Sequence, residues 1–338
     1  MIFLRKILFP LAILYGWITQ FRNFLYDKGI LKSYSFDIPI IAVGNLSVGG
    51  TGKTPQIEYL IRLLSENYKV ATLSRGYKRK SKGFILANEN VTAASLGDEP
   101  YQMHLKFPNV QVAVDVDRKN GIEQLLAQKN KPEIIVLDDA FQHRRVKAGL
   151  YILLTTFEEL YIDDFMLPTG NLRENISGAK RADIIIVSKC PVTISESDRQ
   201  RVKDKLNIDK PIYFSTIAYD DSVYSAESSL RMDELKSISK LLVAGIANPK
   251  PFFAYLQSEG DEVMVFPDHH YFSENDINLI LKKAENKLIV TTEKDFVRLI
   301  YQLPSSQLFY LKMKTMFLID EANFNTIILN FVTAKNVD

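Results

Sequence analysis

The chain has 338 residues, of which 46% are hydrophobic and 24% charged, a composition typical of a globular protein with one large domain or two moderate ones. Its formal net charge of +2 provides no broad basic surface, so we do not expect nucleic acid as the main partner. The single cysteine, Cys190, excludes an internal disulfide framework and fits a reducing compartment.

The first predicted element is an uncharged run from Ile7 to Phe21, preceded by Arg5 and Lys6 and followed by Arg22. The run is shorter than the ~20 residues needed to span a bilayer. No small-residue cleavage site follows it, which argues against a signal peptide. Basic flanks around apolar and aromatic residues are typical of a helix lying in the membrane interface. We therefore expect residues 1–30 to form a membrane-associated helix, with a packing helix of a soluble core as the alternative.

A glycine-rich turn comes next, after a short apolar strand predicted at residues 40–43. A turn between a strand and a helix that ends in Gly-Lys-Thr is typical of a phosphate-binding P-loop, although Ser47 occupies the position of the usual first glycine. Glycines allow backbone N–H groups to point at phosphate oxygens, and the helix N-terminus adds its positive dipole end. We expect Lys53 to reach the β- and γ-phosphates and the Thr54 hydroxyl to bind magnesium. The predicted nucleotide-binding residues are Ser47, Val48, Gly49, Gly50, Thr51, Gly52, Lys53 and Thr54.

Strand and helix patterns alternate from about residue 38 to residue 190, which predicts a mostly parallel sheet with helices on both faces. Asp138 and Asp139 follow one of these strands. A strand that ends in aspartate, downstream of a P-loop, indicates a magnesium ligand opposite Thr54. The basic loop at residues 74–82 also follows a strand, so it could contact phosphate or be an ordinary solvated charge run. The predicted strands are residues 70–73, 110–114, 134–137, 150–155 and 182–188.

The second half of the chain predicts a smaller α/β unit. A polar stretch from Tyr219 to Ser237 predicts a linker or small crossover, and we place the main boundary between residues 31–220 and 221–338. His269 and His270 are adjacent in a loop after a strand, which indicates a functional role. The predicted strands of this unit are residues 241–244, 263–266, 288–291 and 308–311.

Six motifs occur along the chain in the order VGNLSVGGTGKTP, SRGY, GDEP, LDDAFQHR, PTGNLRE and FPDHHYF. This set resembles the tetraacyldisaccharide 4′-kinase family of lipid A biosynthesis, from the N-terminal helix to about Asp295, and Ser47 is usual within that family. The resemblance implies that ATP phosphorylates the 4′-hydroxyl of a tetraacyl glucosamine disaccharide 1-phosphate to give lipid IVA. It implies a P-loop NTPase-like kinase core, a smaller C-terminal α/β domain that closes over the active site, and peripheral or monotopic attachment to the cytoplasmic face of the bacterial inner membrane.

The resemblance also implies roles for single residues. Asp98 of the GDEP motif is the expected catalytic base, paired with a histidine of the second domain. We expect His269 to be that histidine, and His270 is the alternative. Glu174, together with the two aspartates at residues 138–139 and Thr54, is expected at the magnesium centre. Supporting roles are expected for Gln142, His143 and Arg173.

The expected cofactors are therefore ATP and Mg²⁺, and the expected partners are the lipid disaccharide and the membrane surface, with no nucleic acid and no obligate protein partner. Two other classes are considered. One is a P-loop nucleotide hydrolase acting as a membrane-associated switch, and the other is a membrane-peripheral binding protein whose P-loop has lost its function. The sequence contains no guanine-binding Asn-Lys-x-Asp motif, and Ser188-Lys189-Cys190 resembles it only weakly.

Overall fold

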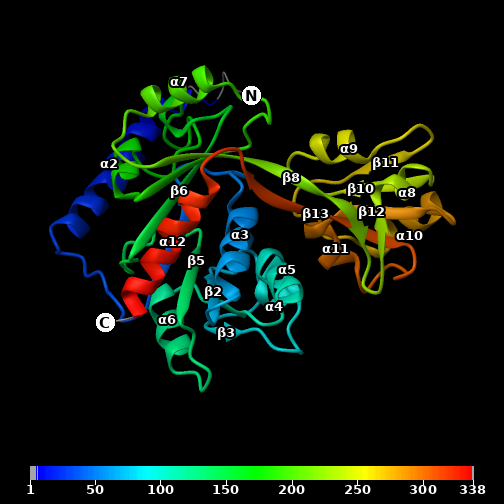
Figure 1. The fold of residues 1–338 in the computed structure, drawn as a ribbon, viewed down its shortest axis with the longest axis horizontal. Coiled ribbons are helices and arrows are strands. Elements are labelled where there is room, and N and C mark those ends of the chain that lie inside the picture. Colours follow the sequence, from blue (N-terminus) through cyan, green and yellow to red (C-terminus); the bar gives the residue numbers. More distant parts are fainter. Residues whose placement is uncertain (1–4, 6, 337–338) are drawn as a thin grey trace.

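A single sheet runs through the protein in the computed structural model, which describes residues 5 and 7–336 (Figure 1). Within the described residues it has thirteen strands in the order β11-β10-β12-β13-β8-β7-β6-β1-β5-β2-β4-β3, with β9 paired to β8. The strands are β1 Ile40–Asn45, β2 Val70–Ser74, β3 Ile85–Leu86, β4 Gln111–Val114, β5 Ile134–Asp138, β6 Leu150–Thr156, β7 Ile184–Ser188, β8 Ile212–Tyr224, β9 Ser229–Arg231, β10 Lys240–Ala244, β11 Glu262–Val265, β12 Leu288–Thr292 and β13 Leu308–Phe317. The predicted mostly parallel α/β sheet is thus confirmed.

Helices cover both faces of this sheet, and Figure 1 shows two lobes. We call the part built on β1–β7 the core lobe and the part built on β10–β12 the small lobe. The helices are α2 Phe9–Asp27, α3 Lys53–Ser65, α4 Ala93–Leu96, α5 Asp98–Lys106, α6 Arg118–Leu126, α7 Glu196–Leu206, α8 Met232–Lys236, α9 Lys250–Leu256, α10 Glu274–Ala284, α11 Glu293–Leu299 and α12 Glu321–Asn336, with 3₁₀ turns η1 Tyr161–Asp163 and η2 Ile176–Arg181.

Strand β1 is buried along its whole length and directs side chains into two hydrophobic cores. Val43 packs with α3 and α12 on one face, and Ala42 packs with α6 on the other. β1 runs parallel to β5 and β6, with Val43 in register with Asp138. Since neighbouring parallel strands end at the same edge of a sheet, the glycine-rich loop after β1 and the aspartates after β5 lie side by side.

Strands β8 and β13 connect the two lobes as a long antiparallel ribbon. β8 begins in the core lobe beside β7 and continues to Tyr224. Of the linker or small crossover predicted from Tyr219 to Ser237, the linker is wrong, because this stretch contains the end of β8, then β9 and α8. Its side chains are mostly half-buried, so it lacks the continuous apolar run that identifies a buried strand. The boundary expected after residue 220 falls inside β8, and the division into domains stays a prediction.

Helix α12 returns from the small lobe to the core lobe. Phe324, Ile328 and Val332 are fully buried there, in the same hydrophobic core as Val43 and Ile57. The final helix of the described chain is thus a structural part of the core lobe, although its residues fall within the range expected for the smaller domain.

Helix α2 lies on the outside of the core lobe (Figure 1) and has an unusual distribution of side chains. The small residues Ala12, Gly16 and Thr19 face inward and are buried. Its outward face is apolar, with 47–70% of each of these side chains exposed: Phe9, Leu11, Ile13, Leu14, Trp17, Ile18, Phe21 and Phe24. Residues 1–4 and Lys6 of the expected first segment lie outside the described residues. None of the described helices is both long and apolar enough to cross a membrane.

Candidate active site

The glycine-rich loop joins β1 to α3 and is held by hydrogen bonds to a neighbouring loop and to the end of β7. Gly49 and Gly52 have φ values of 118° and 87°, a region that favours glycine. Val48 donates its backbone N–H to Asn171 O at 2.8 Å, and the Ser188 hydroxyl donates to Thr51 O at 2.7 Å. Gly52 caps α3, which begins at Lys53, so the first N–H groups of the helix open into the loop. This is the geometry of a phosphate-binding turn.

Several polar groups beside this loop fit an anionic ligand. Lys53 Nζ donates to Asn45 Oδ1 at 3.1 Å and lies 3.6 Å from Asp139 Oδ1. Among the described residues, the buried atoms Thr51 Oγ1 and Asn45 Nδ2 have no hydrogen-bond partner. Buried polar atoms without partners are costly, so their presence at this place indicates a site that a polar ligand completes.

Asp138, the last residue of β5, and Asp139, which follows it, have pKa values shifted in opposite directions. Burial and the neighbouring charge of Asp139 raise the pKa of Asp138 to about 6. Burial acts to raise the pKa of Asp139 as well, but hydrogen bonds from Arg173 and the charge of Lys53 hold it far below its usual value. Arg173 donates to both oxygens of Asp139 at 2.8 Å. Asp138, Asp139 and Thr54 provide oxygen atoms of the kind that Mg²⁺ prefers as ligands. The described residues contain no cluster of three acidic, histidine or cysteine side chains that would bind a metal without other ligands.

Glu174 lies deeper, below α2, and its carboxylate is already surrounded by donors. Arg181 donates to both of its oxygens at 2.8 Å, Gln142 donates to Oε1 and Asn23 of α2 donates to Oε2, each at 2.9 Å. The side chain is completely buried. These contacts favour a structural role that ties α2 to the core lobe, and the expected role of Glu174 at the metal stays a prediction.

Replacing Glu174 by alanine is expected to lower the free energy of unfolding by about 3–5 kcal/mol, because it removes a fully buried carboxylate and leaves the half-buried guanidinium of Arg181 without its partner. Chemical denaturation without nucleotide or Mg²⁺ measures this loss. The control is Glu196→Ala, which removes an ion pair whose carboxylate is 70% exposed and should leave the unfolding midpoint in place. An unchanged midpoint in Glu174→Ala would contradict the structural role.

Asp98 begins α5, and residues of the small lobe meet it there. His269 Nδ1 lies 3.4 Å from Asp98 Oδ2, and Arg298 also donates to Oδ2. His269 has a φ of 59°, a backbone conformation that costs energy for a non-glycine residue and is common at functional sites. His270 instead lies 3.1 Å from Asp276 Oδ2 and stacks on Phe266. Of the two candidate histidines, His269 is the one that the structure brings to Asp98.

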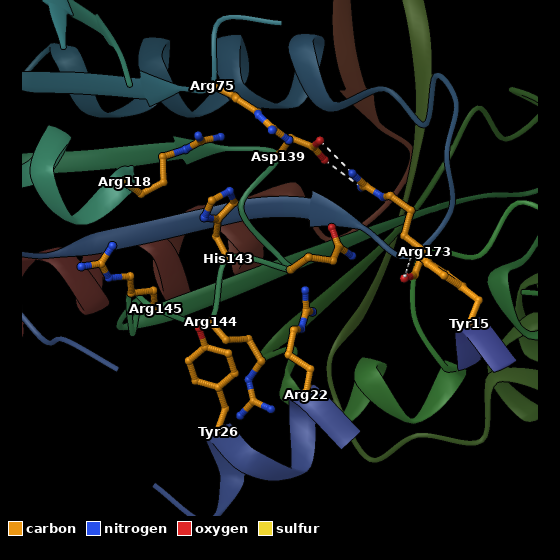
Figure 2. Close-up of a pocket in the computed structure, with 11 residues that line it drawn as sticks. Tyr15, Arg22, Tyr26, Arg75, Arg118, Asp139, His143, Arg144, Arg145 and Arg173 are labelled. Atoms are coloured by element: carbon orange, nitrogen blue, oxygen red, sulfur yellow. Dashed lines mark hydrogen bonds and ion pairs between the residues drawn. The ribbon is translucent and has the colours of Figure 1, made fainter. Parts of the chain in front are cut away.

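A cavity of about 450 Å³ lies between α2 and the strand ends of the core lobe (Figure 2). It reaches Asp139 and Arg173, so it adjoins the P-loop site. The cavity is lined by Tyr15, Arg22, Tyr26, Arg75, Arg118, Asp139, Gln142, His143, Arg144, Arg145 and Arg173.

The lining of this cavity has a large excess of positive charge. Arg144, Arg145 and Arg173 each pair with a carboxylate. Arg22 and Arg118, in contrast, have no carboxylate partner among the described residues, and the Nε atom of each is buried without a hydrogen bond. Burial, followed by the charge of Arg118, lowers the pKa of His143 to about 4, so this imidazole is neutral at physiological pH. Such a cavity favours an anionic ligand.

Sequence reasoning missed the residues that complete the site from distant parts of the chain. Arg298 and Lys294 lie on α11, and Tyr15, Arg22 and Tyr26 come from α2. A signal for the first pair exists, since both are cations spaced four residues apart directly after a predicted strand. For α2, the apolar run predicted only the outward face, and no motif in the sequence indicated that its polar residues line a cavity.

Comparisons with known proteins show which family this chain is similar to. The family model described as tetraacyldisaccharide-1-P 4′-kinase matches residues 4–333. A tetraacyldisaccharide 4′-kinase of Flavobacterium psychrophilum is 62% identical, with 99% of each chain covered, and one of Flavobacterium johnsoniae is 61% identical, with 97% of each covered. The crystal structure of LpxK from Aquifex aeolicus in complex with ATP superposes with a TM-score of 0.80 at 34% identity, covering 97% of this chain and 99% of that one.

Proposed function

This chain belongs to the tetraacyldisaccharide 4′-kinase family, and from that premise we propose how its residues perform the reaction. The enzyme transfers the γ-phosphoryl group of ATP to the 4′-hydroxyl of a tetraacyl glucosamine disaccharide 1-phosphate, giving lipid IVA in lipid A biosynthesis. ATP binding is supported by the similar protein that was crystallised with ATP. Mg²⁺, membrane attachment and the residue roles are proposals.

The observation that carries the proposal is the placement of Lys53 opposite the aspartates of β5. Its Nζ atom lies 3.6 Å from Asp139 Oδ1, so the P-loop and the acidic strand end face one another across one site. Backbone N–H groups at the start of α3 and the Lys53 ammonium would bind the phosphates. Thr54, Asp138 and Asp139 would hold Mg²⁺, which when bound neutralises charge on the phosphoryl oxygens.

Asp98 is the proposed general base. Its carboxylate accepts the proton of the 4′-hydroxyl while that oxygen forms a bond to the γ-phosphorus, and the bond from the γ-phosphorus to the bridging oxygen of ADP breaks. His269 comes from the small lobe, so the lobes must be packed together to complete the pair.

The arginine-lined cavity is the proposed site of the disaccharide head group (Figure 2). Its volume of about 450 Å³ is in the range of small-molecule sites, and its excess of guanidinium groups suits the substrate's phosphate. One wall of the cavity is α2, through Tyr15, Arg22 and Tyr26. The opposite side of α2 is the exposed apolar face. One side of the helix would therefore contact the head group, and the other would contact the lipid that holds the acyl chains.

Replacing Trp17 and Phe21 together by glutamate is expected to lower the fraction of protein bound to membranes by at least ~10-fold. Each ring is more than 60% exposed, and burying such a side chain in lipid contributes about 1.5–3 kcal/mol. Co-sedimentation with phospholipid vesicles measures the effect, and ATP affinity should not change. The control is Val192→Glu, at an exposed apolar residue outside α2. Equal pelleting of the double variant and the control would show that the anchor is elsewhere.

The direct test of the proposed function is incubation of the purified protein with γ-labelled ATP, Mg²⁺ and the lipid disaccharide acceptor. Label transfer to the lipid is the expected result. Acceptor-independent release of phosphate would instead support a nucleotide hydrolase, and neither product would support a binding protein.

A further inference from the structure

Helix α11 of the small lobe packs on α5 of the core lobe through pairs of opposite charge. Lys294 lies 3.5 Å from Glu99, and Glu293 pairs with Lys106 at the other end of α5. Between them, Val297 packs in a small apolar cluster. The other buried residues of that cluster are Leu96, Tyr101 and Val114. These charge pairs fix the position of α11 along α5, and in that position Arg298 contacts Asp98.

Arg298 is held on both sides and is only 10% exposed. One nitrogen donates to Asp98 Oδ2, and the other donates to Asp295 Oδ1 at 3.1 Å. Asp295 is completely buried and is itself fixed, because it accepts hydrogen bonds from Gly245 N at 2.8 Å and from the Thr292 hydroxyl at 2.7 Å. The guanidinium thus connects the carboxylate of Asp98 to the interior of the small lobe.

The contacts of Asp98 are unequal between its two oxygens. Arg298 and His269 both approach Oδ2, whereas Oδ1 has no hydrogen-bond partner among the described residues. The charged groups around this pair are Lys294, which lies 3.0 Å from His269 Nε2, Asp268 at 3.9 Å from the same nitrogen, and Glu99 beside Lys294. Tyr77 packs edge-on against the His269 ring. One oxygen is anchored and the other remains able to accept a proton.

We propose that Arg298 is a positioning residue that anchors Asp98 through Oδ2 and so presents Oδ1 to the acceptor hydroxyl. This inference rests on the proposed role of Asp98 as the base. The planar guanidinium suits the task, because it bridges two carboxylates with fixed geometry, which a lysine ammonium cannot reproduce. A misplacement of a reacting group by about 1 Å can cost up to ~100-fold in rate, so the anchor has a measurable effect.

The test is the pH dependence of kcat for Arg298→Ala and Arg298→Gln. Burial acts to raise the pKa of Asp98, but Arg298 and His269 hold it below its ordinary value. Without the guanidinium this pKa rises, and since the base acts only when deprotonated, the acidic limb of the profile moves to higher pH, by about 1 unit or more. We expect kcat at the optimum to fall about 10-fold, with KM for ATP within about 2-fold of the original value.

Two further variants separate positioning from general loss of structure. Arg298→Lys keeps the charge, so it should restore the acidic limb but only part of kcat. Tyr301→Phe removes the 3.1 Å hydrogen bond from Tyr301, two residues after α11, to Tyr101 of α5, and should leave the pH profile in place. An acidic limb that does not move in Arg298→Ala and Arg298→Gln, or a rise in kcat, would overturn the proposal.

Comparison with Asp98→Asn distinguishes failure of this inference from failure of the proposed function. If Asp98→Asn retains activity, the base assignment fails. If Asp98→Asn is inactive but the Arg298 variants behave like the original enzyme, only the positioning role fails. The double variant that combines Asp98→Asn with Arg298→Ala should be no slower than Asp98→Asn alone, because Arg298 then has no catalytic base to position.

Discussion

Replacing Lys53 by alanine is expected to lower kcat/KM by at least ~100-fold, through loss of a preorganised positive charge at the phosphates. In the structure Lys53 Nζ is held between Asn45 Oδ1 and Asp139, so the ammonium is already in place before the ligand arrives. Steady-state rates of label transfer to the lipid, together with ATP affinity by calorimetry, measure the loss.

A matched control for this variant is Lys119→Ala, because Lys119 is paired with Glu123 on α6 and lies outside the P-loop. Its activity should stay within about 2-fold of the original, since exposed helix pairs contribute little. Thermal unfolding should show that both variants are folded. Near-normal turnover in Lys53→Ala would contradict the P-loop assignment on which the proposed function depends.

Asp98→Asn is expected to lower kcat by at least ~100-fold and to leave ATP affinity within about 2-fold, because the amide keeps the shape of the side chain but cannot accept the proton. Rapid-quench measurement of a single turnover reports the chemical step directly. Asp268→Asn is the control, since Asp268 lies 3.9 Å from His269 Nε2 and pairs with Lys294, and it forms no hydrogen bond with Asp98 in the described part of the chain. Full activity in Asp98→Asn would remove the base assignment.

Much of the core lobe could be predicted because its information is local. The apolar strand before Gly44, the turn ending in Lys53-Thr54 and the aspartates at 138–139 each have a short sequence signature, and parallel strands bring such ends to one edge. The ribbon of β8 and β13 was predicted only at residues 308–311, because most side chains along the part where these two strands pair are half-buried and form no continuous apolar run.

The candidate site could be predicted only in part, because half of it depends on contacts between distant positions. Asp98 and Arg298 are 200 residues apart, and nothing local to either one indicates the other. The choice between His269 and His270 likewise required the fold, since two adjacent side chains point to different partners, Asp98 and Asp276. The resemblance to a family supplied the pairing of Asp98 with a histidine, and the structure supplied which one.

The return of α12 to the core lobe has a consequence for the order in which the protein is made. Phe324, Ile328 and Val332 fill the same hydrophobic core as the P-loop strand and α3. While the ribosome is still translating the small lobe, this face of the sheet has α3 packed on it but lacks the side chains that α12 contributes. We therefore expect the core lobe to be completed only after the segment with α12 has emerged, so that chains released earlier in translation would lack part of the hydrophobic core around β1 and α3.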